Sequence, residues 1–257
     1  MSVDRQGFIG VVGSQPFKVD FHSLLEKVRH ELSPQTLSFI HSVYVYGSIA
    51  TGKAVAARSD LDLTLILNKK PLKRDCELIE NKRQRLESDH PIVSKVDFDI
   101  GLLADIVSVD ANLAWRYWLK HHCRCIAGED LSEDIQPFRP SRKLALEMNG
   151  DFEQVLGKYH RLLHEARTAG NQIRLFTESS RKLIRSTNML RKEEDQDWPD
   201  TLEEHVVRFQ RLYPSHGGEL DYFLRQAREP DAKPECFADR LEAFAGWMSC
   251  VLHSDGQ

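Results

Sequence analysis

Two acidic residues at the start of one strongly apolar segment constrain the fold of this chain more than any other feature of its sequence. Asp60 and Asp62 lead into Leu61–Leu67, in which leucine and isoleucine fill every position except two. Such a segment predicts a strand, and residues two apart on a strand point to one face with Cα atoms about 7 Å apart. Carboxylates that close repel each other, so the pattern indicates a site where cations neutralise them.

Two residues that suit phosphate binding follow a second predicted strand. The segment Val43–Tyr46 is β-branched and aromatic, and Gly47 and Ser48 follow it directly. A glycine lets the backbone approach a phosphate closely, and a serine near a helix start offers a hydroxyl and a backbone N–H. Gly47 and Ser48 are therefore candidates for holding the phosphates of a nucleotide.

A third predicted strand, Lys95–Ile100, supplies further carboxylates. Asp97 and Asp99 are again two residues apart, and either one fits a metal site shared with the first two carboxylates. Two Mg²⁺ ions about 3.5 to 4 Å apart are the usual device for nucleotidyl transfer, and a carboxylate beside one metal can accept the proton of the attacking hydroxyl. The three strands together predict this chemistry.

These segments resemble the nucleotidyltransferase superfamily, which includes DNA polymerase beta, the tRNA CCA-adding enzymes and the antibiotic nucleotidyltransferases. The family pattern is an apolar strand with Gly-Ser, a short gap, Asp-x-Asp, and a later strand with an acidic residue between apolar ones. Residues 40–130 carry this pattern here, with a gap at 49–59. The resemblance implies a nucleotidyltransferase that uses two Mg²⁺ ions.

The same resemblance assigns a role to each candidate residue. It implies that Gly47 and Ser48 bind the nucleotide's phosphates. It also implies that the catalytic and metal-binding set is Asp60, Asp62 and Asp97. Asp97 is preferred to the alternative, Asp99, because the basic and apolar residues Lys95-Val96 precede it as the family pattern requires.

The chain changes character near residues 137–140. Before this point short strands alternate with helices predicted over 21–32, 74–87 and 110–121, and a last strand is predicted over 123–127. Beyond it the apolar residues recur at helical spacing, and helices are predicted over 142–169, 173–191, 202–212, 219–228 and 236–252. We therefore expect the α+β class, with a mixed-sheet nucleotidyltransferase domain at 1–140 and an all-α helical bundle domain at 141–257. This layout resembles bacterial aminoglycoside-type adenylyltransferases.

Composition narrows the range of partners. Lys and Arg number 35 against 39 Asp and Glu, so the net charge is 35 − 39 = −4, which argues against nucleic acid as a partner. No apolar run reaches the roughly 18 to 20 residues that span a bilayer, so we expect no membrane association. The odd count of five cysteines suggests free thiols, and hence a cytoplasmic protein.

The expected reaction is Mg²⁺-dependent transfer of a nucleoside monophosphate to a hydroxyl of a small-molecule acceptor. By the resemblance, ATP is the nucleotide substrate and AMP the group transferred. Two alternatives stay open: a protein acceptor, as in adenylyltransferases of toxin–antitoxin systems, and a regulatory module that binds nucleotide without turnover. In the second half, Arg181, Lys182 and Arg185 either hold triphosphate, as the resemblance suggests, or form a solvated basic face.

Overall fold

The computed structural model describes residues 3–108 and 112–254. The chain divides into two compact units. One is formed by Ile9–Phe138, and the other by the chain from Arg139 onward together with the segment that precedes Ile9. No helix of the described segments is long and apolar enough to cross a membrane.

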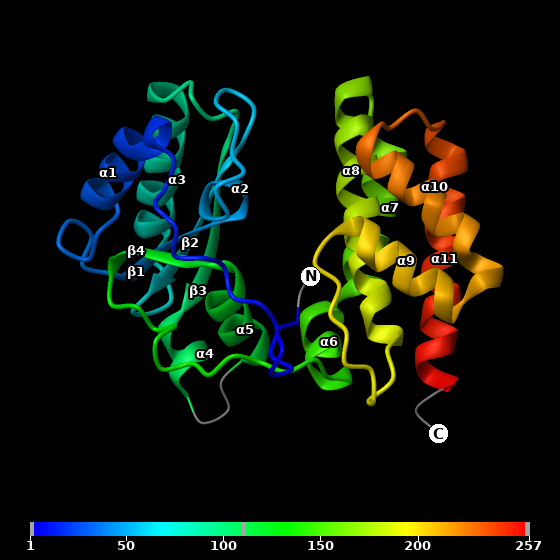
Figure 1. Ribbon diagram of the computed structural model, residues 1–257. Coiled ribbons are helices and arrows are strands. Elements are labelled where there is room, and N and C mark those ends of the chain that lie inside the picture. The colour runs from blue at the N-terminus through cyan, green and yellow to red at the C-terminus, as the bar shows by residue number, and fades with distance from the viewer. Residues whose placement is uncertain (1–2, 109–111, 255–257) are drawn as a thin grey trace. The chain divides into compact units, whose positions relative to one another are not determined.

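Four strands form one mixed sheet in the first unit, in the order β3-β2-β1-β4 (Figure 1). Their bounds are β1 Ile40–Tyr46, β2 Leu61–Leu67, β3 Val96–Leu102 and β4 Arg124–Gly128. Strand β1 runs antiparallel to both β2 and β4, whereas β2 and β3 run parallel. Each strand overlaps a predicted one. This sheet and the helical region that follows it confirm the α+β class.

Different helices cover the two faces of the sheet (Figure 1). The helices of this unit are η1 Val19–Phe21, α1 His22–Glu31, α2 Gly47–Ala50, α3 Lys73–Asp89, α4 Leu103–Val107 and α5 Leu113–His122. Helices α1 and α3 share a core with Val43 and Val45, while α4 and α5 share one with Tyr44 and Ile66. Of the helix predicted over 110–121, residues 110 and 111 lie outside the described segments.

The buried side chain of His121 joins the beginning of the first unit to its end. Its Nδ1 lies 2.9 Å from the Gly10 carbonyl oxygen, and its Nε2 accepts a 3.0 Å hydrogen bond from the Phe138 N–H. The Ile9 N–H also donates to the Phe138 carbonyl oxygen at 2.8 Å. These two ring contacts suit a neutral imidazole with its hydrogen on Nδ1. Burial favours the neutral ring by lowering the pKa of His121.

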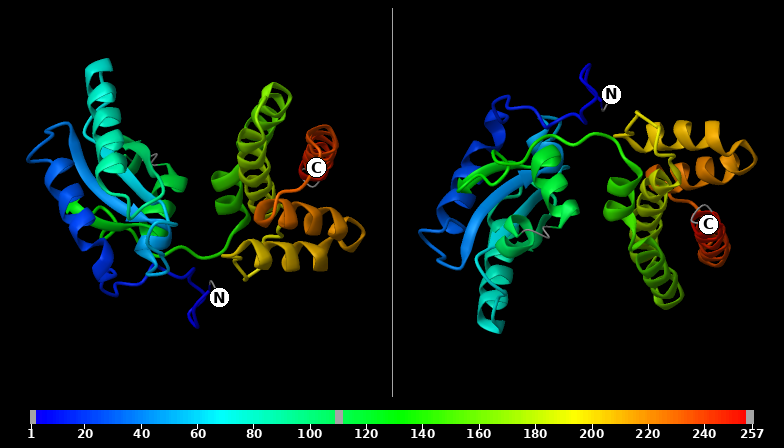
Figure 2. Two further views of the ribbon diagram at one scale, coloured as in Figure 1. Left: turned by 90° about the horizontal axis from the view of Figure 1, so that it is seen from above. Right: turned by 90° about the horizontal axis from the view of Figure 1, so that it is seen from below.

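The second unit is helical. Its elements are α6 Arg142–Asn149, α7 Phe152–Glu165, α8 Ala169–Ser186, η2 Thr187–Leu190, α9 Leu202–Leu212, η3 Pro214–His216, α10 Gly217–Arg228 and α11 Pro234–Ser254. Helix α7 packs against both α8 and α11, and α9 lies beside α10 (Figure 2). The prediction of a single helix over 142–169 is wrong, because Gly150-Asp151 interrupt the helical segment between α6 and α7.

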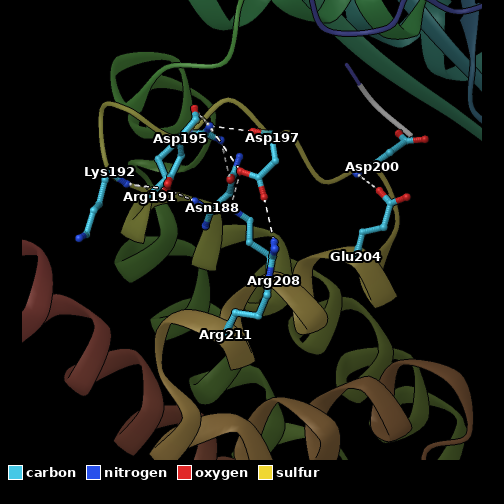
Figure 3. Close-up of polar contacts among 9 residues, drawn as sticks. All are labelled: Asn188, Arg191, Lys192, Asp195, Asp197, Asp200, Glu204, Arg208 and Arg211. Atoms are coloured by element: carbon cyan, nitrogen blue, oxygen red, sulfur yellow. Dashed lines mark hydrogen bonds and ion pairs between the residues drawn. The ribbon is translucent and has the colours of Figure 1, made fainter. Parts of the chain in front are cut away.

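A buried arginine holds the loop between η2 and α9 (Figure 3). The side chain of Arg191 is fully buried and donates hydrogen bonds to the carbonyl oxygens of Asp195 and Asp197, at 2.6 and 2.7 Å, and to Asn188 Oδ1 at 3.1 Å. The guanidinium of Arg208 pairs with the carboxylates of Asp195 and Asp197. Burial and the charge of Arg208 lower the pKa of Arg191 to about 10. We call these five residues the Arg191 cluster.

Candidate active site

Three carboxylates converge on one face of the sheet. Asp60 lies directly before β2, Asp62 lies in β2, and Asp97 lies in β3. Asp62 and Asp97 are partners in the parallel ladder, so their side chains stand next to each other on the same face. One carboxylate oxygen from each of the three residues lies within 4.8 Å of the other two. Across 3–108 and 112–254, no other His, Cys, Asp or Glu trio comes as close.

The antiparallel pairing of β1 with β2 brings Gly47 to this group. Tyr46, the last residue of β1, is opposite Asp62, and Gly47 begins the short helix α2. Gly47 has a φ of 69°, a conformation that residues with a Cβ rarely adopt. A Cβ on Gly47 would overlap Oδ2 of Asp62. Ser48 is the second residue of α2, so the backbone turn that follows β1 lies beside the carboxylates.

The charge of the group is poorly balanced by protein cations. Burial, and then the charges of Asp60, Asp97 and Asp99, together raise the pKa of Asp62 to about 6, while the charge of Lys95 acts in the opposite direction. Nζ of Lys95 is 2.7 Å from Oδ1 of Asp97. An all-oxygen set of carboxylates with excess negative charge fits hard divalent cations such as Mg²⁺. The residues present therefore suit Mg²⁺.

Asp99 lies apart from the group, although it shares its strand face with Asp97. Oδ2 of Asp99 accepts a 2.7 Å hydrogen bond from the hydroxyl of Tyr46. Asp99 is opposite Thr64 in the ladder, and Thr64 is two residues beyond Asp62. Burial and the nearby charge of Asp99 hold the pKa of Tyr46 well above its usual range. The structure thus places the two alternative carboxylates in different surroundings.

Sequence reasoning assigned no contact in the site to three residues that touch the acidic residues of these strands: Tyr46, Ser94 and Lys95. Ser94 Oγ donates a 2.6 Å hydrogen bond to Oδ1 of Asp60. Tyr46 lies in the predicted strand directly before Gly47, but only the pairing of β1 with β2 sets it on the face of the carboxylates. Ser94 precedes the predicted third strand, and no sequence pattern indicated that its side chain contacts a carboxylate.

The basic residues suggested in the second half lie on α8 of the helical unit. Nζ of Lys182 pairs with Oδ1 of Asp151 at 2.6 Å, so this lysine is already neutralised. Arg181 is exposed. The pKa of Arg185 is lowered by desolvation and by the charges of Arg181 and Arg228. Mutual repulsion of this kind is compatible with either interpretation of these residues.

Without metal, Asp62 is expected to destabilise the protein as the pH rises from about 4 to about 6. Its folded-state pKa is raised from 3.8 to about 6, so it is protonated in both states at low pH, and stability is lost as the pH passes through the folded-state value. The loss is at most about 3 kcal/mol. Urea unfolding in EDTA at pH 4 to 7 should show Asp62→Asn gaining stability relative to wild type. A pH-independent difference would contradict this.

Replacement of Gly47 by alanine is expected to lower kcat at least about tenfold. Alanine at a φ of 69° costs roughly 1–2 kcal/mol, and its Cβ would push the Asp62 carboxylate out of the group. Steady-state kinetics and thermal unfolding measure the two effects. Gly52→Ala is a matched control, because Gly52 has a φ of 70° and open space where a Cβ would lie. If both variants lose activity equally, backbone strain is the cause and the clash with Asp62 is not.

One family model covers the part of the chain that holds this site. Residues 23–111 match the family model described as "Nucleotidyltransferase domain", and this range includes Gly47, Ser48 and all three carboxylates. The chain therefore carries a nucleotidyltransferase domain and is an enzyme of the class that transfers nucleoside monophosphates. This confirms the superfamily inferred from the sequence motifs.

One solved structure and one negative result complete the comparison. The chain is similar to the crystal structure of spectinomycin adenyltransferase AAD(9) from Enterococcus faecialis with ATP and spectinomycin. That match has a TM-score of 0.47 and 13% sequence identity, and it covers 86% of this chain and 99% of the other. No curated protein matches the chain.

Proposed function

We propose that this enzyme transfers AMP from ATP to a hydroxyl of a small-molecule acceptor, with Mg²⁺ as the metal. The observation that supports the proposal is the convergence of Asp60, Asp62 and Asp97 beside Gly47. Carboxylates in this number and proximity suit two divalent cations, and the tight glycine turn suits a triphosphate. The choice of ATP and of a small acceptor rests on the family resemblance.

Each residue has a distinct part in the proposed reaction. Asp60 and Asp62 would hold both Mg²⁺ ions, and Asp97 would hold one of them. Bound Mg²⁺ supplies charge neutralisation at the phosphates and acidifies the acceptor hydroxyl. Gly47 and Ser48 would orient the triphosphate through backbone N–H groups and the serine hydroxyl.

Asp97 would also act as the base. Its carboxylate takes the proton of the acceptor hydroxyl as the acceptor oxygen bonds to the α-phosphorus. The bond from the α-phosphorus to the oxygen that bridges it to the β-phosphate breaks, and pyrophosphate leaves. The products are the adenylylated acceptor and pyrophosphate, so no further reactant is needed.

We also propose that the predicted domains divide this work. Residues 1–140 would carry the transfer chemistry, and the helical bundle at 141–257 would select the acceptor. In the structure the segment before Ile9 groups with the helical unit. Swapping the helical unit for that of a related enzyme should change the acceptor and leave pyrophosphate release dependent on Asp62.

The decisive experiment measures pyrophosphate release from ATP and Mg²⁺ in the presence of a panel of hydroxyl-bearing small molecules. Mass spectrometry identifies the modified acceptor, and EDTA and Asp62→Asn serve as blanks. Label from ATP on a protein would favour a protein acceptor, and tight ATP binding without any turnover would favour a regulatory module. Equal ATP affinity in Mg²⁺ and in EDTA, measured by calorimetry, would contradict the metal site itself.

The two acidic residues of β3 are expected to differ in activity assays. Asp97→Asn should lower kcat at least about 100-fold with little change in ATP affinity, because Asp60 and Asp62 remain to hold metal and triphosphate. Asp99→Asn should cost less than about tenfold, because Asp99 lies outside the group and bonds to Tyr46. The reverse order would move the base to Asp99. Two mild variants would show that the base is another residue.

A further inference from the structure

A second set of metal-ligating side chains lies in the helical unit. His160 and His164 are four residues apart on α7, so both side chains lie on one face of that helix. Their Nε2 atoms are 3.4 Å apart. Helix α11 packs against α7 and contributes Glu242, whose Oε2 lies 3.8 Å from Nε2 of His160. None of these residues takes part in the proposed transfer reaction.

The spacing of the two imidazole nitrogens suits one tetrahedral metal ion. With Zn–N bonds of about 2.0 to 2.1 Å, a nitrogen separation of 3.4 Å corresponds to an N–Zn–N angle of about 110°. Two histidines four apart on a helix are also the arrangement by which metalloproteases chelate zinc. The side chain of Glu242 is 74% exposed, so its own torsions can bring a carboxylate oxygen into the third position.

A hollow beside His160 and Glu242 leaves room for water next to these two ligands, while His164 lines another hollow. The first hollow has a volume of about 340 Å³, and the residues that line it include Glu153, His160 and Glu242. Two carboxylates on the wall of one small hollow attract a cation. Zinc with three protein ligands usually keeps a fourth position for water, and this hollow can supply that water.

We propose that His160, His164 and Glu242 bind a divalent transition-metal ion of the zinc class and thereby link α7 to α11. Imidazole nitrogens select Zn²⁺, Ni²⁺ and Cu²⁺, whereas carboxylates alone suit Mg²⁺. The site is therefore chemically distinct from the all-carboxylate group on the sheet, and it does not depend on the proposed function.

The test is calorimetric titration of the untagged full chain with Zn²⁺ in a large excess of Mg²⁺, which occupies the carboxylate group. Wild type should bind one Zn²⁺, and His160→Asn and His164→Asn should each weaken binding at least tenfold. Glu242→Gln should weaken it several-fold. Two controls should bind like wild type: Asp62→Asn, which alters the other site, and His30→Asn, which removes an exposed histidine of α1.

Thermal unfolding provides a second readout. An ion that links two helices binds the folded state only, so Zn²⁺ should raise the Tm of wild type and not that of His164→Asn. His164 is exposed, so this variant should fold normally. Equal Zn²⁺ affinity in wild type and His164→Asn would overturn the proposal, as would loss of Zn²⁺ binding in Asp62→Asn alone. Unchanged affinity in Glu242→Gln would overturn the link to α11.

Discussion

Asp62→Asn is expected to lower kcat at least about 100-fold, because the proposed two-metal site would lose a shared ligand and with it several kcal/mol of charge stabilisation. Asp62 is the carboxylate that faces Asp97 in the ladder and touches the Gly47 turn, so its loss disturbs metal and triphosphate together. Steady-state kinetics with saturating ATP and Mg²⁺ measure the effect.

The stability of the same variant separates this explanation from simple misfolding. At pH 7 and without metal, Asp62→Asn should unfold at the same temperature as wild type or a higher one, because it removes a partly buried charge that its neighbours repel. Retention of more than about a tenth of wild-type kcat would argue against two-metal catalysis. A drop in both kcat and Tm would point instead to a structural role.

Arg191→Met is expected to lower the free energy of unfolding by about 3 kcal/mol or more. The variant would leave the carbonyl oxygens of Asp195 and Asp197 without their buried donor, and Arg208 would keep carboxylate partners on a loop that is no longer fixed. Urea unfolding measures the loss, and hydrogen exchange of the amides in α8 and α9 shows whether it falls on the helical unit.

Arg211→Met is the matched control for the Arg191 cluster. Arg211 also pairs with Asp197, at 3.3 Å, but its side chain is 69% exposed. Exposed ion pairs contribute about 0 to 1 kcal/mol, so this variant should unfold nearly like wild type. Equal losses in the two variants would show that the ion pairs with Asp197, and not the buried hydrogen bonds of Arg191, stabilise the loop.

The strands of the site could be predicted because their residues repeat a short-range pattern. Alternation in Leu61–Leu67 set Asp62 on one face, and the residues Gly47 and Ser48 marked the end of β1. Sequence spacing also limited the third carboxylate to Asp97 or Asp99. It did not rank them on physical grounds, because both lie on one face and only the register of β2 with β3 sets Asp97 against Asp62.

Long-range contacts explain what the sequence left out. The hydrogen bond from Tyr46 to Asp99 joins residues 53 positions apart and crosses the intervening strand β2. In the helical unit, apolar periodicity predicted one helix through Gly150 and outweighed the local signal of a glycine followed by an aspartate. No feature of the sequence predicted that Arg191 is buried, because arginine side chains normally lie at the protein surface.

The hydrogen bond between Ile9 and Phe138 means that the first and last residues of the first unit lie next to each other. The segment Asp4–Phe8 and the residues from Arg139 onward belong to the helical unit, so the sheet unit is topologically an insertion within it. Units with adjacent ends tolerate circular permutation and transplantation into a host protein. A ribosome also completes Ile9–Phe138 before it makes α6, so the sheet unit can fold during translation while the helical unit is still being synthesised.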